Sequence, residues 1–121
     1  MPNNAASNSP LDGIGHIPVA CDLSVFTDLE RARHEQTGIA LFRQVEEIKD
    51  LTNGYAFRFV NEDATLFNLC TFISNEQRCC PFFQFEIQVL ANHGPIWLRL
   101  TGDDANSVKA LIANSPLLPP L

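Results

Sequence analysis

Asn75-Glu-Gln-Arg-Cys-Cys-Pro-Phe-Phe-Gln-Phe-Glu86 is the stretch in which this 121-residue chain changes from helix to strand. Pro81 has no amide hydrogen and disfavours helical geometry in the residue before it, so the helix must end at or before Pro81. An alternation of apolar and polar residues begins immediately afterwards, which is typical of a strand. Two adjacent thiols, Cys79 and Cys80, therefore lie at a helix-to-strand corner, and Glu76 lies on their side of the helix, one turn earlier.

The residues before this corner predict two strands and two helices. Ile14–Leu23 reads as a short strand with Cys21 near its end, and Thr27-Asp-Leu-Glu30 is a capping box that begins a helix running to about Lys49. The turn signal Asn53-Gly54 precedes a strand from Tyr55 to Val60. Asp63 is the expected N-cap of a helix over 64–79. The apolar stripe predicted for this second helix is Leu66, Leu69, Cys70, Ile73 and Gln77.

The residues after the corner predict a hairpin and a last helix. Its strands are Phe82–Leu90 and Pro95–Thr101, joined around Asn92-His93-Gly94, which brings Glu86 opposite Arg99. Asp103 or Asp104 is expected to cap a helix that runs to about Ala113. This order of elements predicts an α+β fold of two layers, with the helices on one face of a four-stranded, mostly antiparallel sheet.

Composition places the chain in one domain and excludes several partner classes. We expect a disordered N-terminal tail over 1–13, a single domain over 14–115 and an apolar C-terminal tail over 116–121. Hydrophobic residues make up 45% of the chain and the net charge is −6, with eight scattered Lys and Arg. This predicts no nucleic-acid partner and no membrane span. Four cysteines without an export signal predict a cytoplasmic protein with free thiols.

The adjacent pair Cys79-Cys80 is the strongest candidate site. Zinc and softer ions bind thiolate, and a helix end beside a tight turn holds two thiolates close together. The competing explanation is that both cysteines fill small spaces in the core, as free cysteines commonly do. A disulfide between the two neighbours is disfavoured, because adjacent residues rarely allow the preferred geometry.

Two further residues extend this candidate site and one is excluded from it. Glu76 could be an oxygen ligand or a base for a thiol proton, or simply a solvated carboxylate. Cys21 could supply a third thiolate or be a core cysteine. If it is a ligand, we expect its sulfur within about 4 Å of another cysteine sulfur, since thiolates sharing an ion bind it at about 2.3 Å each. Cys70 lies about 15 Å before Cys80 along the helix, so we expect it in the core.

Other candidate groups are weaker. His34 lies on the charged half of the first helix, His93 in a hairpin turn and His16 near the N-terminus. The chain contains no Cys-x-x-Cys pair, no glycine-rich phosphate loop and no Gly-x-Ser-x-Gly.

Several segments together resemble a small bacterial domain whose activity is not established. They are Ile17-Pro-Val-Ala-Cys21-Asp-Leu, Glu30-Arg-Ala-Arg-His34, Gly54-Tyr-Ala-Phe-Arg-Phe59, Glu76-x-Arg-Cys-Cys-Pro-Phe-Phe-x-Phe-Glu86 and Gly94-Pro-Ile-Trp-Leu-Arg-Leu-Thr-Gly102. A shorter relative of that domain is fused to regulators similar to the mercury-responsive type. The resemblance implies that Cys21, Glu76, Cys79 and Cys80 belong to the family motif and that Cys70 does not. The last helix matches only approximately.

Three functions remain open from the sequence. The first is a thiolate metal-binding domain for zinc or another thiophilic ion such as mercury, with Cys21, Glu76, Cys79 and Cys80 as ligands. The second is a thiol-dependent enzyme, a lyase or reductase, in which one cysteine attacks, the other resolves and Glu76 moves the proton. The third is an interaction domain with structural cysteines, whose apolar surface near Phe82 and Trp97 could serve a partner or a homo-oligomer.

Overall fold

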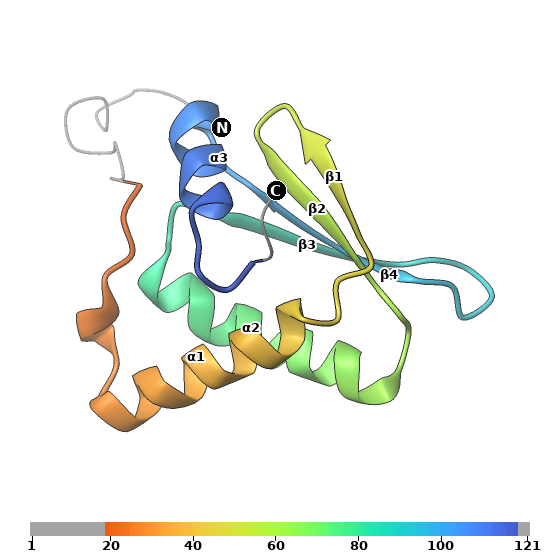
Figure 1. The fold of residues 1–121 in the computed structure, drawn as a ribbon, viewed down its shortest axis with the longest axis horizontal. Coiled ribbons are helices and arrows are strands. Elements are labelled where there is room, and N and C mark those ends of the chain that lie inside the picture. Colours follow the sequence, from red (N-terminus) through yellow and green to blue (C-terminus); the bar gives the residue numbers. More distant parts are fainter. Residues whose placement is uncertain (1–18, 119–121) are drawn as a thin grey trace, which may run out of the picture.

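The computed structural model describes residues 19–118 (Figure 1). Its elements, in chain order, are the 3₁₀ turn η2 (Leu23–Val25), α1 (Asp28–Phe42), β1 (Glu47–Leu51), β2 (Gly54–Phe59), α2 (Asp63–Cys79), β3 (Gln84–Val89), β4 (Ile96–Thr101) and α3 (Ala105–Ala113). None of the helices in this part of the chain is long and apolar enough to cross a membrane.

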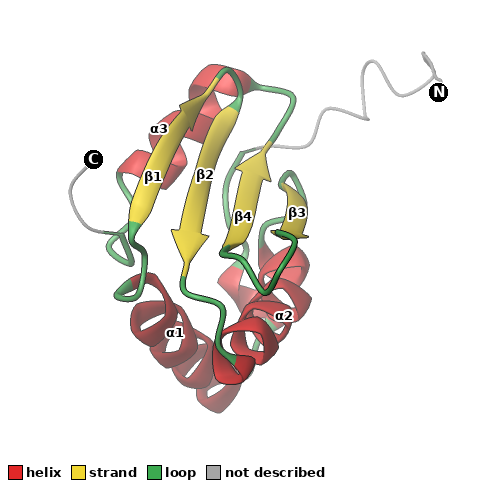
Figure 2. Cartoon of the chain, turned by 90° about the vertical axis from the view of Figure 1, so that its right-hand side faces the viewer, coloured by secondary structure: helices red, strands yellow, loops and turns green. Residues whose placement is uncertain are grey.

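The four strands form one antiparallel sheet in the order β1-β2-β4-β3. Figure 2 looks onto these strands, with α3 behind them and the pair α1 and α2 at their lower end. The predicted α+β fold with a four-stranded antiparallel sheet is confirmed. The predicted pairing of Glu86 with Arg99 is also confirmed, and their side chains lie 3.2 Å apart.

One face of the sheet carries the core. Phe57 on β2 lies opposite Leu98 on β4, and both side chains are fully buried. The other face is polar, with Arg58 opposite Trp97 and the Lys49 ammonium 4.5 Å from the centre of the Trp97 ring. The buried residues that the three helices add to the core are Leu41, Phe42, Leu69, Phe72, Val108 and Ile112.

Helices α1 and α2 approach each other closely where α1 has a glycine. A Cβ on Gly38 would lie 3.3 Å from Cε1 of Phe72 and 2.9 Å from Cδ1 of Leu117, so a larger residue would force these neighbours to move. Gly38 belongs to a buried stripe on α1 that also includes His34 and Leu41. The matching stripe on α2 is Thr65, Leu69, Phe72 and Cys79, at spacings of three and four residues. These two stripes pack α1 against α2.

The prediction that the first helix reaches Lys49 is wrong. Helix α1 ends at Phe42, and residues 47–51 form β1, which pairs with β2. The physical reason is the hairpin: Leu51 pairs with Gly54 across a two-residue turn, and a turn of this kind joins two strands. The Asn53-Gly54 signal therefore marks a turn as predicted, but this turn joins two strands rather than a helix and a strand.

The predicted strand over Ile14–Leu23 is also wrong where the structure describes it. Residues 19–22 are not in a strand, and Leu23–Val25 form a 3₁₀ turn. The Asp22 carboxylate accepts a hydrogen bond from the Ser24 amide, which favours a turn over an extended strand. Residues 14–18 and the predicted N-terminal tail lie outside the described residues.

The predicted helix ends are mostly confirmed. Both hydrogen bonds of the Thr27–Glu30 capping box are present, and Asp104 caps α3. The N-cap of α2 is Glu62 rather than Asp63, without a side-chain hydrogen bond. Of the C-terminal tail, Leu117 and Leu118 pack against the core and residues 119–121 lie outside the described range.

Two phenylalanines on α2 provide a matched test of this packing. Phe72 is 1% exposed and Phe67 is 74% exposed. We expect Phe72→Ala to lower the free energy of unfolding by about 3–5 kcal/mol because it leaves a cavity in the core. Phe67→Ala should change it by less than about 0.5 kcal/mol. Urea denaturation of the two variants measures the difference, and similar losses in both would contradict the assigned faces of α2.

Candidate metal centre

Three cysteine sulfurs meet at the end of α2. The helix ends at Cys79 and Cys80 is its C-cap, so the helix stops before Pro81 as predicted. Cys21 is joined to Cys80 by a disulfide, with 4.7 Å between their Cα atoms. The Sγ atoms of Cys79 and Cys80 lie 3.6 Å apart. The prediction that Cys21 lies at this corner is therefore confirmed.

The chain around Cys21 is held against α2 by its backbone. The amide of Asp22 donates to the carbonyl of Cys79 over 2.8 Å, which satisfies one of the carbonyls that a helix end leaves free. Phe26, Cys79 and Cys80 form a small buried cluster, packed by Leu23 and Phe82. These contacts, rather than strand pairing, bring Cys21 to the corner.

The disulfide contradicts the expectation that the cysteines of this chain are free thiols. Cys21 and Cys80 are bonded, whereas Cys70 and Cys79 are free. The two ends of the bond differ in access, because Cys80 is 0% exposed and Cys21 is exposed. A reagent from solution therefore reaches this disulfide through Cys21.

The thiol of Cys79 is strongly protonated at neutral pH. Burial, followed by the charge of Glu76 and a hydrogen bond to it, raises the pKa of Cys79 from 9.0 to about 12. Its Sγ lies 3.5 Å from both the carbonyl oxygen and Oε1 of Glu76. Since reactive cysteines have a depressed pKa, Cys79 is not an activated nucleophile in this state.

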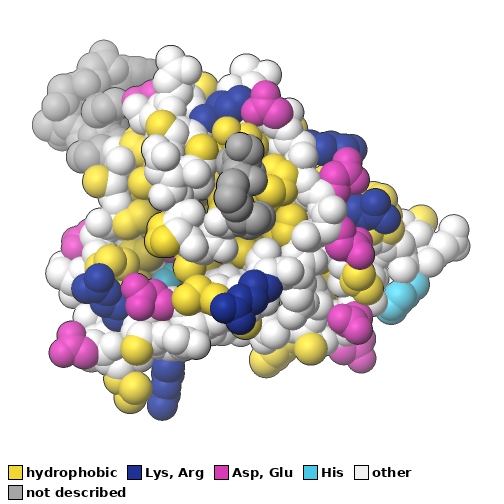
Figure 3. All heavy atoms as spheres, viewed as in Figure 1, with side chains coloured by type: hydrophobic (Ala, Val, Ile, Leu, Met, Phe, Trp, Pro, Cys, Tyr) yellow, Lys and Arg dark blue, Asp and Glu magenta, His cyan; other side chains and the backbone are white. Residues whose placement is uncertain are grey.

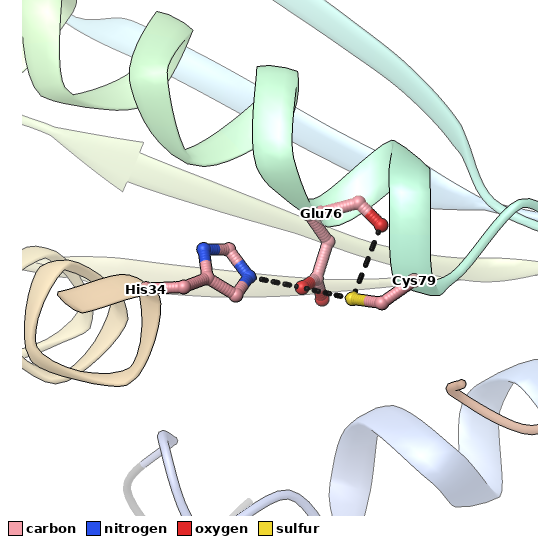
Figure 4. Close-up of side chains that lie close together, drawn as sticks. All are labelled: His34, Glu76 and Cys79. Atoms are coloured by element: carbon pink, nitrogen blue, oxygen red, sulfur yellow. Dashed lines mark hydrogen bonds and ion pairs between the residues drawn. The ribbon is translucent and has the colours of Figure 1, made fainter. Parts of the chain in front are cut away.

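Glu76 is held by a histidine from the other helix (Figure 4). Nε2 of His34 on α1 lies 2.7 Å from Oε1 of Glu76, and the two side chains are only 8% and 15% exposed. The His34 ring packs against Phe72 and Phe26, with ring centres 5.2 and 5.3 Å away. His34 lies four residues before Gly38 and seven before Leu41, so helical spacing is the signal that places it on the buried stripe of α1.

The tautomer of His34 follows from its unpaired nitrogen. Nδ1 is buried and has no hydrogen-bond partner among the described residues. A proton on Nδ1 would be a buried donor without an acceptor, which costs about 1–3 kcal/mol. A neutral ring with its proton on Nε2 avoids this cost and donates to the Glu76 carboxylate.

His34, Glu76 and Cys79 are close enough to hold a metal ion. One ligand atom from each lies within 4.8 Å of the others, and two of the three residues are buried. The three donors are nitrogen, oxygen and sulfur, a combination that suits zinc. Figure 4 shows the three side chains pointing toward one another from α1 and the last turns of α2.

The remaining candidate groups lie elsewhere. Cys70 is exposed, so its predicted place in the core is wrong. The buried stripe of α2 passes through Leu69 and Phe72 and leaves Cys70 on the solvent side. His93 lies at the β3–β4 turn, 3.1 Å from the carbonyl of Asn61, and His16 is outside the described residues.

An apolar cavity of about 250 Å³ adjoins this site. Cys21 and Glu76 lie on its wall together with side chains from α1, α2, β4, α3 and the segment 114–118. The described lining contains no charged side chain besides Glu76. The cavity therefore places the exposed end of the disulfide beside a space suited to an apolar group.

Searches of protein-family models, curated proteins and solved structures find no match to this chain.

The raised pKa of Cys79 predicts a loss of stability in alkali. The folded state favours the protonated thiol, so its contribution is complete below pH 9 and is lost as the pH rises from 9 toward 12. For one proton the free energy of unfolding falls by at most about 1.4 kcal/mol per pH unit. Denaturation of wild type and Cys79→Ala between pH 7 and 10.5 isolates this effect, because other groups titrate equally in both. A constant difference between the two proteins across this range would contradict the assignment.

Proposed function

We propose that this protein is a thiolate metal-binding domain for zinc or a softer, thiophilic ion. Cys21, Cys79, Cys80 and Glu76 are the proposed ligands, and His34 orients Glu76. The observation that carries the proposal is the convergence of three sulfurs and a partly buried carboxylate at the end of α2. In a reducing compartment such as the cytoplasm the Cys21–Cys80 bond would open and release two of these ligands.

The distances between the donors suit a shared ion. Two thiolates bound at about 2.3 Å in a tetrahedral site lie about 3.8 Å apart. The separation of the Cys79 and Cys80 sulfurs, 3.6 Å, is close to this value. Cys21 is already within bonding reach of Cys80, so only a small movement would follow reduction.

The position at a helix C-terminus favours a cation over a free thiolate. The macrodipole of α2 adds partial negative charge at this end. It adds to the effect of Glu76, which raises the pKa of Cys79. A bound cation has the opposite effect on Cys79, because a metal deprotonates the thiol that coordinates it. The same field argues against a low-pKa catalytic cysteine here.

His34 is better suited to support the site than to bind the ion. Binding through Nε2 would move the ring proton to Nδ1, where no described residue accepts it. With the proton on Nε2, His34 donates to Glu76 and fixes the carboxylate toward Cys79. Hydrogen bonds of this kind commonly hold a ligand in place behind a metal.

The apolar cavity favours one second function, a thiol-dependent lyase or reductase. A cavity with a carboxylate and a sulfur on its wall is a reasonable substrate site. Cys79 and Cys80 would then share attack and resolution, with Glu76 moving the proton. The raised pKa of Cys79 counts against it as the attacking group. An interaction domain with purely structural cysteines is the remaining possibility, and it predicts no ligand at all.

Metal retention under reducing conditions tests the proposal. Protein reduced and loaded with zinc should keep about one equivalent after gel filtration, measured by elemental analysis. Cys79→Ser and Cys80→Ser should each lose it, because the ion then lacks a thiolate. Cys70→Ser is the matched control and should retain the full equivalent, since Cys70 is exposed and remote from the site. Oxidised wild-type protein should retain much less than reduced protein.

The variant His34→Gln tests whether His34 holds Glu76 in place or binds the ion itself. The glutamine amide can still donate to Glu76, so affinity should fall by about 10–100-fold, as for other supporting residues. No zinc in reduced wild type, or full retention in both Cys79→Ser and Cys80→Ser, would refute the metal-binding function.

A further inference from the structure

We propose that the apolar cavity binds a small apolar thiol and captures it on Cys21 as a mixed disulfide. This inference does not require metal binding at the corner. It rests on three observations that meet at one place: an apolar cavity, a disulfide with one accessible end, and a buried partner sulfur that can leave.

The cavity selects for an apolar body of limited size. Its walls include Phe42, Phe72, Phe83 and Leu100, and its volume is about 250 Å³. An empty cavity of about 150 Å³ in another protein is large enough for benzene, so this one has room for a phenyl group with a short side chain. Figure 3 shows hydrophobic side chains gathered between α3 and the α1–α2 pair, where the elements that line the cavity meet.

The reactive end of the ligand follows from the position of Cys21. Cys21 lies on the cavity wall, whereas Cys80 is fully buried. A sulfur that arrives from the cavity therefore meets the Cys21 side of the disulfide. The group that reacts with a disulfide is a thiolate, so the ligand class is a thiol with an apolar substituent.

The exchange is balanced without any further reagent. The ligand sulfur forms a bond to Sγ of Cys21, and the bond between Cys21 and Cys80 breaks. Cys80 takes up the proton that the ligand thiol has lost and is released as a neutral thiol. The ligand sulfur is oxidised and the sulfur of Cys80 is reduced. While the ligand stays on Cys21, this cysteine is not available to a metal.

Exchange kinetics on metal-free, oxidised Cys70→Ser protein test the inference. The probe is 2-phenylethanethiol, and 2-mercaptoethanol is the polar comparison of the same alkyl-thiol type. With the phenyl thiol the rate should saturate with concentration, because binding precedes reaction. At low concentration it should exceed the rate with 2-mercaptoethanol by at least about tenfold, the effect expected from burying a phenyl group. Peptide mapping should locate the adduct on Cys21.

Two controls connect the rate to the cavity. Toluene, which cannot react, should slow the phenyl thiol and leave 2-mercaptoethanol unaffected. Leu111→Trp fills the cavity and should remove saturation, whereas Leu29→Trp on the exposed surface of α1 should not. Equal, non-saturating rates for the two thiols, or an adduct on Cys80, would overturn the inference. Because no metal is present, failure here would leave the metal-binding proposal intact, and failure of zinc retention would leave this inference intact.

Discussion

The termination of α2 before Pro81 is the constraint on which the rest of the site depends. It leaves the carbonyl of Cys79 free to accept from Asp22, and this bond holds the segment that carries Cys21. It also places two sulfurs at the negative end of a helix dipole, beside a partly buried carboxylate. In a continuous helix the Cys79 carbonyl would accept an intrahelical hydrogen bond instead, and the Cys21 segment would lose this partner. The proline thus determines both the position and the electrostatics of the corner.

The sequence predicts the β3–β4 hairpin, the start of α1 and the end of α2 because their signals are local. Pro81, the Thr27–Glu30 box and the alternation in β3 act within a few residues. It does not predict β1, because residues 47–51 have a pattern that suits a helix as well, and only pairing with β2 decides between them. The candidate site shows the same difference between local signals and long-range packing. Glu76 and Cys79 lie one turn apart on the same helix, so their spacing identifies them as candidate site residues. His34 comes close to them only because α1 packs on α2.

The disulfide and the cavity show why chemistry at this corner depends on its redox state. In the oxidised form Cys79 is the free thiol of the three, and its proton is held tightly by burial and by Glu76. Opening the disulfide would add two sulfurs without rebuilding the fold, since the core of β2, β4 and the helices does not include them. The proposed metal binding and the proposed thiol exchange would therefore compete for Cys21.

X-ray absorption at the zinc edge of reduced, zinc-loaded protein shows directly whether the three cysteines at the end of α2 bind the ion. If the three cysteines and Glu76 bind the ion, the spectrum should show three sulfur neighbours at about 2.3 Å and one oxygen or nitrogen at about 2.0–2.2 Å. Cys70→Ser should give the same spectrum. A shell made only of nitrogen and oxygen would contradict it, because the ion would then be bound away from the three cysteines at the end of α2.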